Sequence, residues 1–295
     1  MPLPLRRPNP HYGNAIPIDP ADVPARLGHR YDEVVRLTEA HTLAVQRWLP
    51  ALAPQVNRFE GRGTTAVANG MPARLFNQAL GASYSGVSEA EIEAEIAAVI
   101  GFLTARSPRW LWWLGPSTYP PDFPARLERR GLVCARDLPA MVAPLPLDPL
   151  PATAPNLEVW QARTCADLAA ASLIRRAAFH FAPGAGETYF EDAADDWLAG
   201  DPARLYLVRE SGGPPAAIGA LIVAEGVPGI YVMATLPEYE RRGMGLAVLV
   251  RMMVDAAQEG HDLLVLTASP KGFGLYRKVG FEYLFDFHLY HLPEM

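Results

Sequence analysis

The run from Gly229 to Ser269 constrains the fold of this chain more than any other, because two apolar strands enclose a glycine turn and a long apolar helix. GIYVMAT and DLLVLTAS are continuous apolar segments, and MGLAVLVRMMVDAAQ is apolar all round except for one polar stripe. A strand, a helix and a strand in this order form a βαβ unit, whose two strands run parallel with a right-handed crossover. The fold must therefore contain a parallel strand pair joined by a buried helix.

The glycine turn of this unit, YERRGMG, lies where the carboxyl end of a strand meets the N-terminus of a helix. Backbone N–H groups are unpaired at such a point, and the helix dipole favours an anion. Gly243 and Gly245 lack side chains that would hold a phosphate away, and Arg241 and Arg242 add positive charge. The alternative is that the glycines only allow a tight turn, but the surrounding elements favour a phosphate or pyrophosphate site.

Two common phosphate-binding motifs are absent. The chain has no GxxxxGK[ST] motif and no GxGxxG after its first strand, so the sequence supports neither a P-loop NTPase nor a Rossmann dinucleotide site.

Composition narrows the class of protein further. The chain has 295 residues, half of them apolar, enough for one large domain or two ordinary ones, and its net charge of −6 gives no reason to expect nucleic acid. No apolar run approaches the ~20 residues of a membrane span, and the N-terminus lacks the apolar stretch of a signal peptide. Cys134 and Cys165 lie far apart without metal-ligand spacing, and the histidines show no HExxH motif. We therefore expect a cytoplasmic protein with no metal site.

A proline-rich segment divides the sequence. PLPLDPLPATAP, from Pro144 to Pro155, favours an extended connector, which predicts a domain boundary near residue 152. Periodicity on the second side predicts strands at 157–162, 203–210, 216–225, 229–235, 262–269 and 281–292, and helices at 165–179, 188–200, 244–258 and 272–280. On the first side it predicts a helix at 87–105, an apolar strand near 109–117, a short helix at 124–132 and a strand at 133–145.

Two motifs in order resemble a known family. The run ATLPEYERRGMGLAVLV resembles the coenzyme-binding motif, usually Gln/Arg-x-x-Gly-x-Gly/Ala, of the GNAT superfamily of acyl-CoA-dependent N-acyltransferases. LLVLTASPKGFGLYRKVGFEYL resembles the same family's later motif, which ends in Tyr-x-x-x-Gly-Phe, here Tyr276 to Phe281. The resemblance covers roughly residues 156 to 292 and implies an α/β (mixed α+β) fold, a mixed sheet flanked by helices, with acetyl-CoA as co-substrate and no metal.

The resemblance also implies site residues. The backbone of Met233, Ala234 and Thr235 would bond the pantetheine arm, and Ser269 would face the coenzyme. Tyr276 would donate a proton to the departing thiolate as the general acid. The amides that would wrap the pyrophosphate are those of Arg241, Arg242, Gly243, Met244, Gly245 and Leu246.

One position departs from the family pattern. Glu240 stands where the family usually has Gln or Arg, and a carboxylate facing a pyrophosphate would repel it. We therefore expect Glu240 to turn outward and the adjacent arginines to supply the positive charge.

The first half resembles a degenerate repeat of the second. LERRGL aligns with LYRKVGF if a one-residue gap is allowed, and Glu128 then takes the place of the tyrosine. The helix near residue 88 begins with a capping box, Ser88 to Glu91. No Lys or Arg occurs between Gly81 and Thr104, and four glutamates crowd the helix start, namely Glu89, Glu91, Glu93 and Glu95. These patterns predict two tandem GNAT-like domains, residues 1–152 without a coenzyme site and residues 153–295 active.

Three further features allow two interpretations each. Trp110, Trp112 and Trp113 favour core or domain interface over a ligand platform. Glu225, at the end of a strand, is a weak candidate for the general base. An acidic cluster is typical of a solvated helix face, although in this family the region often borders the acceptor site, and it consists of Glu187, Glu191, Asp192, Asp195 and Asp196.

The leading functional hypothesis is acetyl transfer from acetyl-CoA to a primary amine of a small molecule or peptide by direct attack. The alternatives are a non-catalytic acyl-CoA binding or sensing protein and, among enzymes, a tandem-domain synthase similar to mycothiol synthase. The sequence predicts no nucleic-acid or membrane partner. The acceptor, the general base, the contribution of the first half and the oligomeric state, with a homodimer among the options, stay open.

Overall fold

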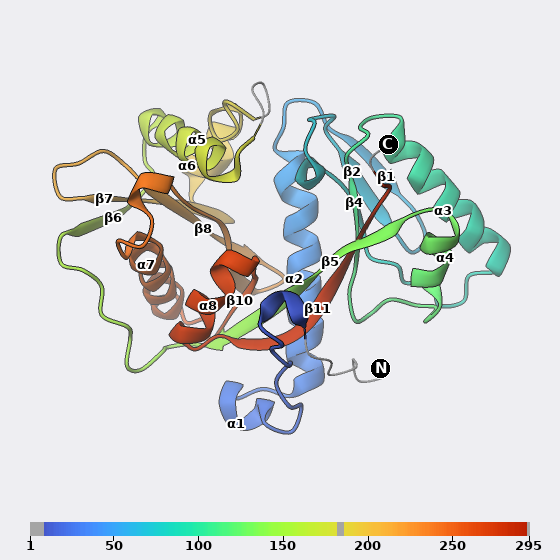
Figure 1. Ribbon diagram of the computed structural model, residues 1–295, viewed down its shortest axis with the longest axis horizontal. Coiled ribbons are helices and arrows are strands. Elements are labelled where there is room, and N and C mark those ends of the chain that lie inside the picture. Colours follow the sequence, from blue (N-terminus) through green and yellow to red (C-terminus); the bar gives the residue numbers. More distant parts are fainter. Residues whose placement is uncertain (1–8, 182–185, 294–295) are drawn as a thin grey trace.

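The computed structural model describes residues 9–181 and 186–293, and it shows two lobes on either side of a long central helix, α2 (Figure 1). The first half of the chain contributes α1 (Val23–Leu27), α2 (Tyr31–Ala51), β1 (Asn57–Glu60), β2 (Thr65–Ala68), β3 (Asn77–Leu80), α3 (Glu89–Thr104), β4 (Leu111–Leu114), α4 (Phe123–Arg129) and β5 (Val133–Pro144). The second half contributes β6 (Leu157–Gln161), α5 (Cys165–Phe179), α6 (Ala194–Ala199), β7 (Ala203–Glu210), β8 (Ala217–Ala224), β9 (Val227–Thr235), α7 (Met244–Gln258), β10 (Leu263–Thr267), α8 (Pro270–Val279) and β11 (Glu282–His291).

The eleven strands form one mixed sheet in the order β1-β2-β3-β4-β11-β5-β10-β9-β8-β7-β6. Two pairs are parallel, β3 with β4 and β9 with β10, and each pair is connected through one helix, α3 or α7. The predicted βαβ unit with parallel strands is therefore confirmed in the second half. The first half contains a unit of the same kind.

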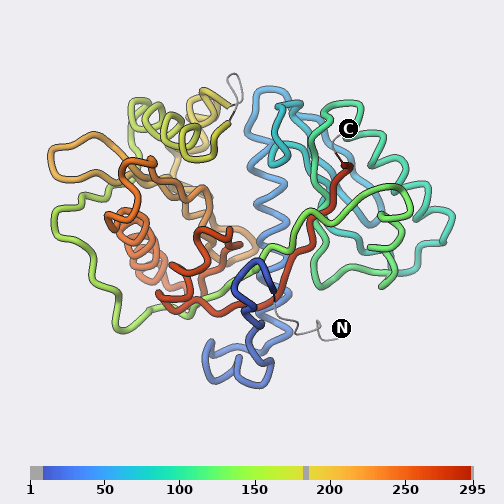
Figure 2. Tube along the Cα trace, in the orientation of Figure 1, coloured from blue at the N-terminus to red at the C-terminus, as the bar shows by residue number. Residues whose placement is uncertain are grey.

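The closing strands of the two halves cross over between the lobes. β5, from the first half, lies between β10 and β11, whereas β11, the last strand of the chain, lies between β4 and β5. Figure 2 shows the two as long neighbouring segments, green and red, that run from one lobe to the other. Each half therefore has its parallel strand paired with the closing strand of the other half. The boundary near residue 152 stays a prediction, because the sheet is continuous across it.

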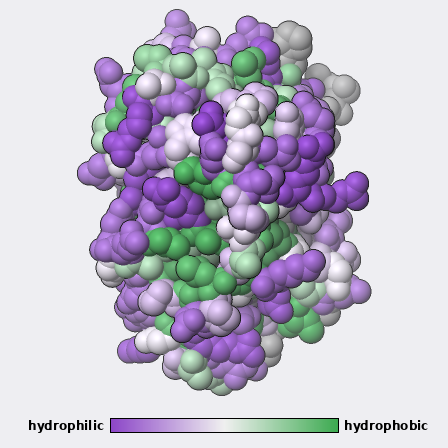
Figure 3. All heavy atoms as spheres, turned by 90° about the vertical axis from the view of Figure 1, so that its left-hand side faces the viewer, coloured by the Kyte–Doolittle hydropathy of each residue, from purple (hydrophilic) through white to green (hydrophobic). Residues whose placement is uncertain are grey.

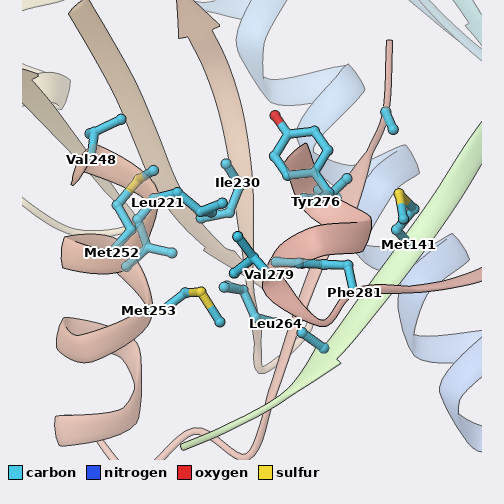
Figure 4. Packing of buried hydrophobic residues seen from close by; sticks show 14 of the residues in the cluster. Met141, Leu221, Ile230, Val248, Met252, Met253, Leu264, Tyr276, Val279 and Phe281 are labelled. Carbon is cyan, nitrogen blue, oxygen red and sulfur yellow. The ribbon is translucent and has the colours of Figure 1, made fainter. Parts of the chain in front are cut away.

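Helices cover both faces of the sheet in the second half. α7 and α8 pack on one face in an apolar cluster that includes Leu221, Ile230 and Met252 (Figure 4). α5, α6 and the end of α2 cover the other face in a cluster around Phe190 and Trp197. The helix predicted over 165–179 and that over 244–258 have the same bounds as α5 and α7.

The tryptophan cluster lies inside the molecule. The side chains of Trp110, Trp112 and Trp113 are at most 1% exposed, so they form no ligand platform. Trp112 packs with the α3 and α4 layer of the first half, and Trp113 packs against Phe287 of β11, with ring centres 5.6 Å apart. The preference for core and interface is confirmed.

The outer surface is mostly polar. Figure 3 shows the face of the second half with hydrophobic residues gathered in a band across its middle and hydrophilic residues above and below. Within the described part of the chain, no helix is both long and apolar enough to cross a bilayer.

Candidate functional site

The parallel strands β9 and β10 separate soon after they meet. They pair only through Gly229 with Val265 and Ile230 with Leu266, although β9 continues to Thr235. Beyond Ile230 the β10 side of β9 is therefore open, while its other side stays paired with β8. The opening presents a strand edge on which an extended ligand can form backbone hydrogen bonds.

A bulge in β9 marks the start of this opening. Val232 has φ 52°, a left-handed conformation that is rare for a β-branched residue, and the register with β8 shifts between Ile218 and Ala220. Gly219 lies opposite the bulge, where a Cβ would come within 2.7 Å of the Met233 sulfur. Strain of this kind persists where the surrounding structure fixes it, and bulges often re-aim backbone groups at binding sites.

The predicted pantetheine-binding segment follows the bulge. The amide of Leu236 donates to Ala216 O at 2.9 Å, so Leu236 faces β8. Because alternate residues of a strand direct their amides to opposite sides, Thr235 and Met233 direct theirs to the open side. Ala234 between them pairs with Ile218 on β8.

The glycine turn opens directly onto the N-terminus of α7. Gly243, the N-cap residue, has φ 84°, Arg241 has φ 60°, and no side chain caps the helix. The amides of the first turn are therefore free of a protein cap, and left-handed residues of this kind are typical of anion-binding backbone turns. A Cβ added at Gly245 would lie 3.7 Å from Leu275, its nearest neighbour, so the space beside this residue is open. No side chain therefore stands between the Gly245 backbone and an approaching anion.

The charged side chains of the turn are partly paired. Arg242 lies 3.3 Å from Glu210, and Arg241 is exposed. Glu240 does not simply point into solvent as expected, because its carboxylate forms an ion pair with Lys271 of α8. The lysine neutralises the one acidic group in the turn.

Ser269 lies directly before α8, and Tyr276 lies within that helix. Ser269 is the N-cap, and its hydroxyl oxygen accepts a hydrogen bond from the amide of Gly272 at 3.2 Å. The Tyr276 side chain is buried, and in Figure 4 its hydroxyl points away from Leu264, Val279 and Phe281. Among the described residues nothing forms a hydrogen bond with that hydroxyl, and burial raises its pKa well above the usual value near 10.

A cavity of about 120 Å³ adjoins the bulge from the opposite face of the sheet. It lies where α2, α5 and the turn before β3 meet β9, so both halves of the chain supply its walls. Sequence patterns did not predict it, because its residues come from distant segments. The lining consists of Gln46, Leu49, Leu75, Phe76, Arg175, Phe179, Phe181, Tyr189, Tyr231 and Val232.

The acidic candidates lie elsewhere. Glu225 is in the turn between β8 and β9, seven residues before Val232, which is roughly 20 Å along a strand. Glu187 pairs with Arg176 at 3.5 Å, and Glu191 accepts a hydrogen bond from the Ser172 hydroxyl. None of the five acidic residues of that cluster lines the cavity, and its charged lining residue is a cation.

In the first half, glutamates crowd the start of α3, the helix that follows β3 as α7 follows β9. Ser88 and Glu91 form the predicted capping box at the start of α3, so the amide of Glu91 in the first turn is already bonded. Glu95 accepts the amides of residues 62 to 64 at 2.7 to 3.1 Å. Glu89 and Glu93 both pair with Arg126 of α4, at 2.5 and 3.1 Å.

One group of potential metal ligands does come together in the described part of the chain, although the sequence spacing did not indicate it. Cys134 and Asp137 of β5 face His288 of β11, and the three ligand atoms lie within 4.8 Å of one another. His288 already forms an ion pair with Asp137 at 2.6 Å. Both cysteines of the chain are free and exposed.

Comparison with known proteins finds a family model and curated relatives that resemble part of this chain. The family model "Acetyltransferase (GNAT) domain" matches residues 154–273. A mycothiol acetyltransferase of Tsukamurella paurometabola is 32% identical over 178 residues, which cover 54% of this chain and 60% of that protein. The chain spans less than two thirds of the length of the curated relatives that it matches.

Solved structures share the fold over most of the chain. A GCN5-related N-acetyltransferase from Kribbella flavida superposes with a TM-score of 0.63 at 17% identity, covering 86% of this chain and 96% of that one. A tandem GNAT protein from the clavulanic acid biosynthesis pathway superposes with a TM-score of 0.56 at 13% identity, covering 88% and 94%.

Proposed function

Because residues 154–273 match the family model of the GNAT acetyltransferase domain, we propose that this protein transfers an acetyl group from acetyl-CoA to a primary amine. The observation that carries the proposal is that three features occur together on β9, α7 and α8, whose buried residues share one apolar cluster. They are the open edge of β9 after its bulge, the uncapped start of α7 and the Tyr276 hydroxyl. The pantetheine arm of acetyl-CoA would extend along Met233 and Thr235. Its pyrophosphate would accept the amides from Arg241 to Leu246, which fits the preference of helix N-termini for phosphate.

The acceptor amine enters from the cavity on the other face of the sheet. Tyr231 and Val232 form part of the cavity wall and also begin the open part of β9, so an amine there lies next to the thioester. Attack needs the neutral amine, and deprotonating an amine of pKa near 10.4 at pH 7 costs about 4.6 kcal/mol. A base or a water chain must therefore accept that proton.

Tyr276 completes the transfer as the general acid. The amine nitrogen forms a bond to the carbonyl carbon, the bond from carbon to sulfur breaks, and the departing thiolate takes the phenolic proton. Burial raises the pKa of Tyr276, which keeps it protonated but makes it a weaker acid. The same low-dielectric surroundings raise the pKa of the coenzyme thiol. The difference between the pKa of the phenol and that of the thiol therefore changes less than either pKa.

We assign coenzyme binding to the second half alone. The capping box at Ser88 already bonds the amide of Glu91 in the first turn of α3, and Glu89 adds negative charge beside it. The first half would then serve as a wall of the acceptor cavity, through Gln46 and Phe76.

A turnover assay tests the proposal. The purified chain is incubated with acetyl-CoA and a panel of primary amines, and release of free thiol is followed together with formation of the acetylated amine. Amine-dependent thiol release supports N-acetyl transfer, whereas tight binding of acetyl-CoA with no turnover on any amine supports the non-catalytic alternative. A mycothiol-type acceptor is the second candidate, because the curated relatives carry that name, and it belongs in the same panel.

A further inference from the structure

The cavity beside the β9 bulge contains a cation with no anionic partner. Arg175 of α5 is 6% exposed and forms no ion pair with any described residue, and its Nη1 atom is buried without a hydrogen-bond partner. Resting on the proposed function, we propose that Arg175 binds a carboxylate of the acceptor, so that the acceptor is an amino-acid-like molecule with both an amine and a carboxylate.

Aromatic rings hold the guanidinium in place. Its central carbon lies 3.9 Å from the ring centre of Tyr189, 4.7 Å from that of Phe181 and 5.1 Å from that of Phe76. The Tyr189 ring is itself fixed, because its hydroxyl donates to Leu49 O at 3.1 Å. Such contacts engage the faces of the guanidinium and leave its N–H donors, which lie in its plane, available to an oxygen ligand.

Burying the Arg175 guanidinium costs free energy unless an anion binds to it. Burial lowers the pKa of Arg175 to about 10, so the group is still charged at pH 7 while it has lost its water. Buried polar atoms are nearly always hydrogen-bonded, and buried charges are paired. A structural role would need only an apolar side chain of similar length. A carboxylate, in contrast, would match the fork of N–H donors with two parallel hydrogen bonds.

The remaining walls indicate the shape of the acceptor. Leu75 and Phe179, at the mouth, are 38% and 41% exposed, so the cavity opens to solvent. Inside, Leu49, Phe76 and Tyr231 are apolar or aromatic. A volume of about 120 Å³ is below the ~300 Å³ at which pockets for drug-sized ligands begin, so one end of a small molecule fits.

The cavity also determines how the acceptor is oriented, with its carboxylate at one end and its amine at the other. Arg175 and the bulge residue Val232 line the same small space, and Val232 begins the edge on which the thioester would lie. A carboxylate held by Arg175 would therefore direct the amine of the same molecule towards β9. The acidic residues between 187 and 196 do not repel a carboxylate bound in this orientation, because none of them lines the cavity and Glu187 pairs with Arg176.

The first experiment measures binding without chemistry. Calorimetry compares 3-phenylpropanoate with its neutral amide on the full chain saturated with coenzyme A. We expect the carboxylate to bind about 10-fold or more tightly than the amide, and Arg175→Met to abolish the difference. Arg175→Lys, which keeps the charge, should retain part of it. Equal binding of the two probes by the wild type would overturn the inference.

The matched control is Arg176→Met. Arg176 is the next residue on α5, and its partner is Glu187, so this change should leave the preference for the carboxylate intact. Removing an unpaired buried charge should also raise the melting temperature of Arg175→Met above that of the wild type. A lower melting temperature together with an unchanged preference would show that Arg175 is only a packing residue.

The second experiment measures transfer and separates this inference from the proposed function. Free amino acids are compared with their C-terminal amides as acceptors, and a higher kcat/KM for the acids, lost in Arg175→Met, supports the inference. If both are acetylated equally well, the acetyltransferase stands and the carboxylate site is refuted. If neither is acetylated but the binding preference holds, the anion site stands and the proposed function fails.

Discussion

Lys271, at the start of α8, forms an ion pair with Glu240, in the turn before α7. The pair joins the two motifs of the proposed coenzyme site, which are separated by a helix and a strand in the sequence. It also explains how a carboxylate is tolerated beside the phosphate loop.

Removing the lysine should therefore weaken coenzyme binding indirectly. In Lys271→Met the Glu240 carboxylate is left unpaired beside the phosphates, and repulsion of about 1 kcal/mol corresponds to a loss of affinity of roughly 5-fold at low ionic strength. The double variant Lys271→Met, Glu240→Gln should regain most of the loss in calorimetric titration. Lys278→Met, on the exposed side of the same helix, serves as the control, and an equal loss there would refute the pairing argument.

Gly245 offers a cleaner test of the phosphate loop than Gly243. Gly243 has φ 84°, so any side chain there strains the backbone, whereas a side chain at Gly245 meets ordinary contacts. Gly245→Val should lower coenzyme affinity about 10-fold or more, because the side chain lies where the pyrophosphate must approach the amides. Gly274→Val, in open space on α8, makes the same change as a control. Unchanged affinity in calorimetry would remove the loop from the coenzyme site.

Replacing Tyr276 with Phe should affect rate more than stability. We expect kcat to fall by about 10²-fold with coenzyme binding nearly intact, since a general acid contributes in this range. Because none of the described residues bonds its hydroxyl, the melting temperature should hardly change. Tyr206→Phe is the contrasting control, because the Tyr206 hydroxyl donates to Asp255 at 2.8 Å and its loss should destabilise the fold but spare kcat. A wild-type rate in the Tyr276 variant under chemistry-limited conditions excludes it as the acid.

Coenzyme stoichiometry tests the assignment of the first half. Equilibrium dialysis should find one coenzyme A per chain, because the capping box at Ser88 already bonds the amide of Glu91 and glutamates crowd the start of α3. Two sites of equal affinity would show that the first half has kept the binding function.

The ion pair of His288 with Asp137 predicts a pH-dependent contribution to stability. The carboxylate raises the pKa of His288 from 6.5 to about 10. A raised folded-state pKa stabilises the fold fully below pH ~6.5, and this stabilisation is lost as the pH rises through ~10. Asp137→Asn should therefore lower the melting temperature at pH 6 and have little effect near pH 10.5. Both side chains are more than a third exposed, so the effect should stay below ~1 kcal/mol. An equal decrease in melting temperature at both pH values would contradict this assignment.

Local patterns were sufficient for most of the second half. α5, α7 and β7 have the bounds that their sequence indicates, because each has a regular apolar period that matches its burial. The predicted helix over 188–200 instead becomes a short 3₁₀ turn, Glu191–Ala193, followed by α6.

The central helix α2 was not predicted, for a physical reason. Its segment is amphipathic, but its buried face mixes Val34, Val35 and Val45 with polar side chains, which are not typical of a core-facing stripe and include Thr38, Glu39, His41 and Gln46. These groups are buried because two halves of the chain enclose the helix, which no local pattern reveals. The same holds for Arg175, which has the sequence context of an ordinary helix residue until β9, α2 and residues 75–76 surround it.

The exchanged closing strands have a consequence for how this protein could be divided or recombined. The outer edge of β10 is covered by β5 of the first half, and the outer edge of β4 is covered by β11 of the second half. A segment that starts at residue 153 would expose the edge of β10 and also leave β11 without its neighbours β4 and β5. Neither half is therefore a portable module, and a transplant of residues 154–295 has to carry Val133–Pro144 with it.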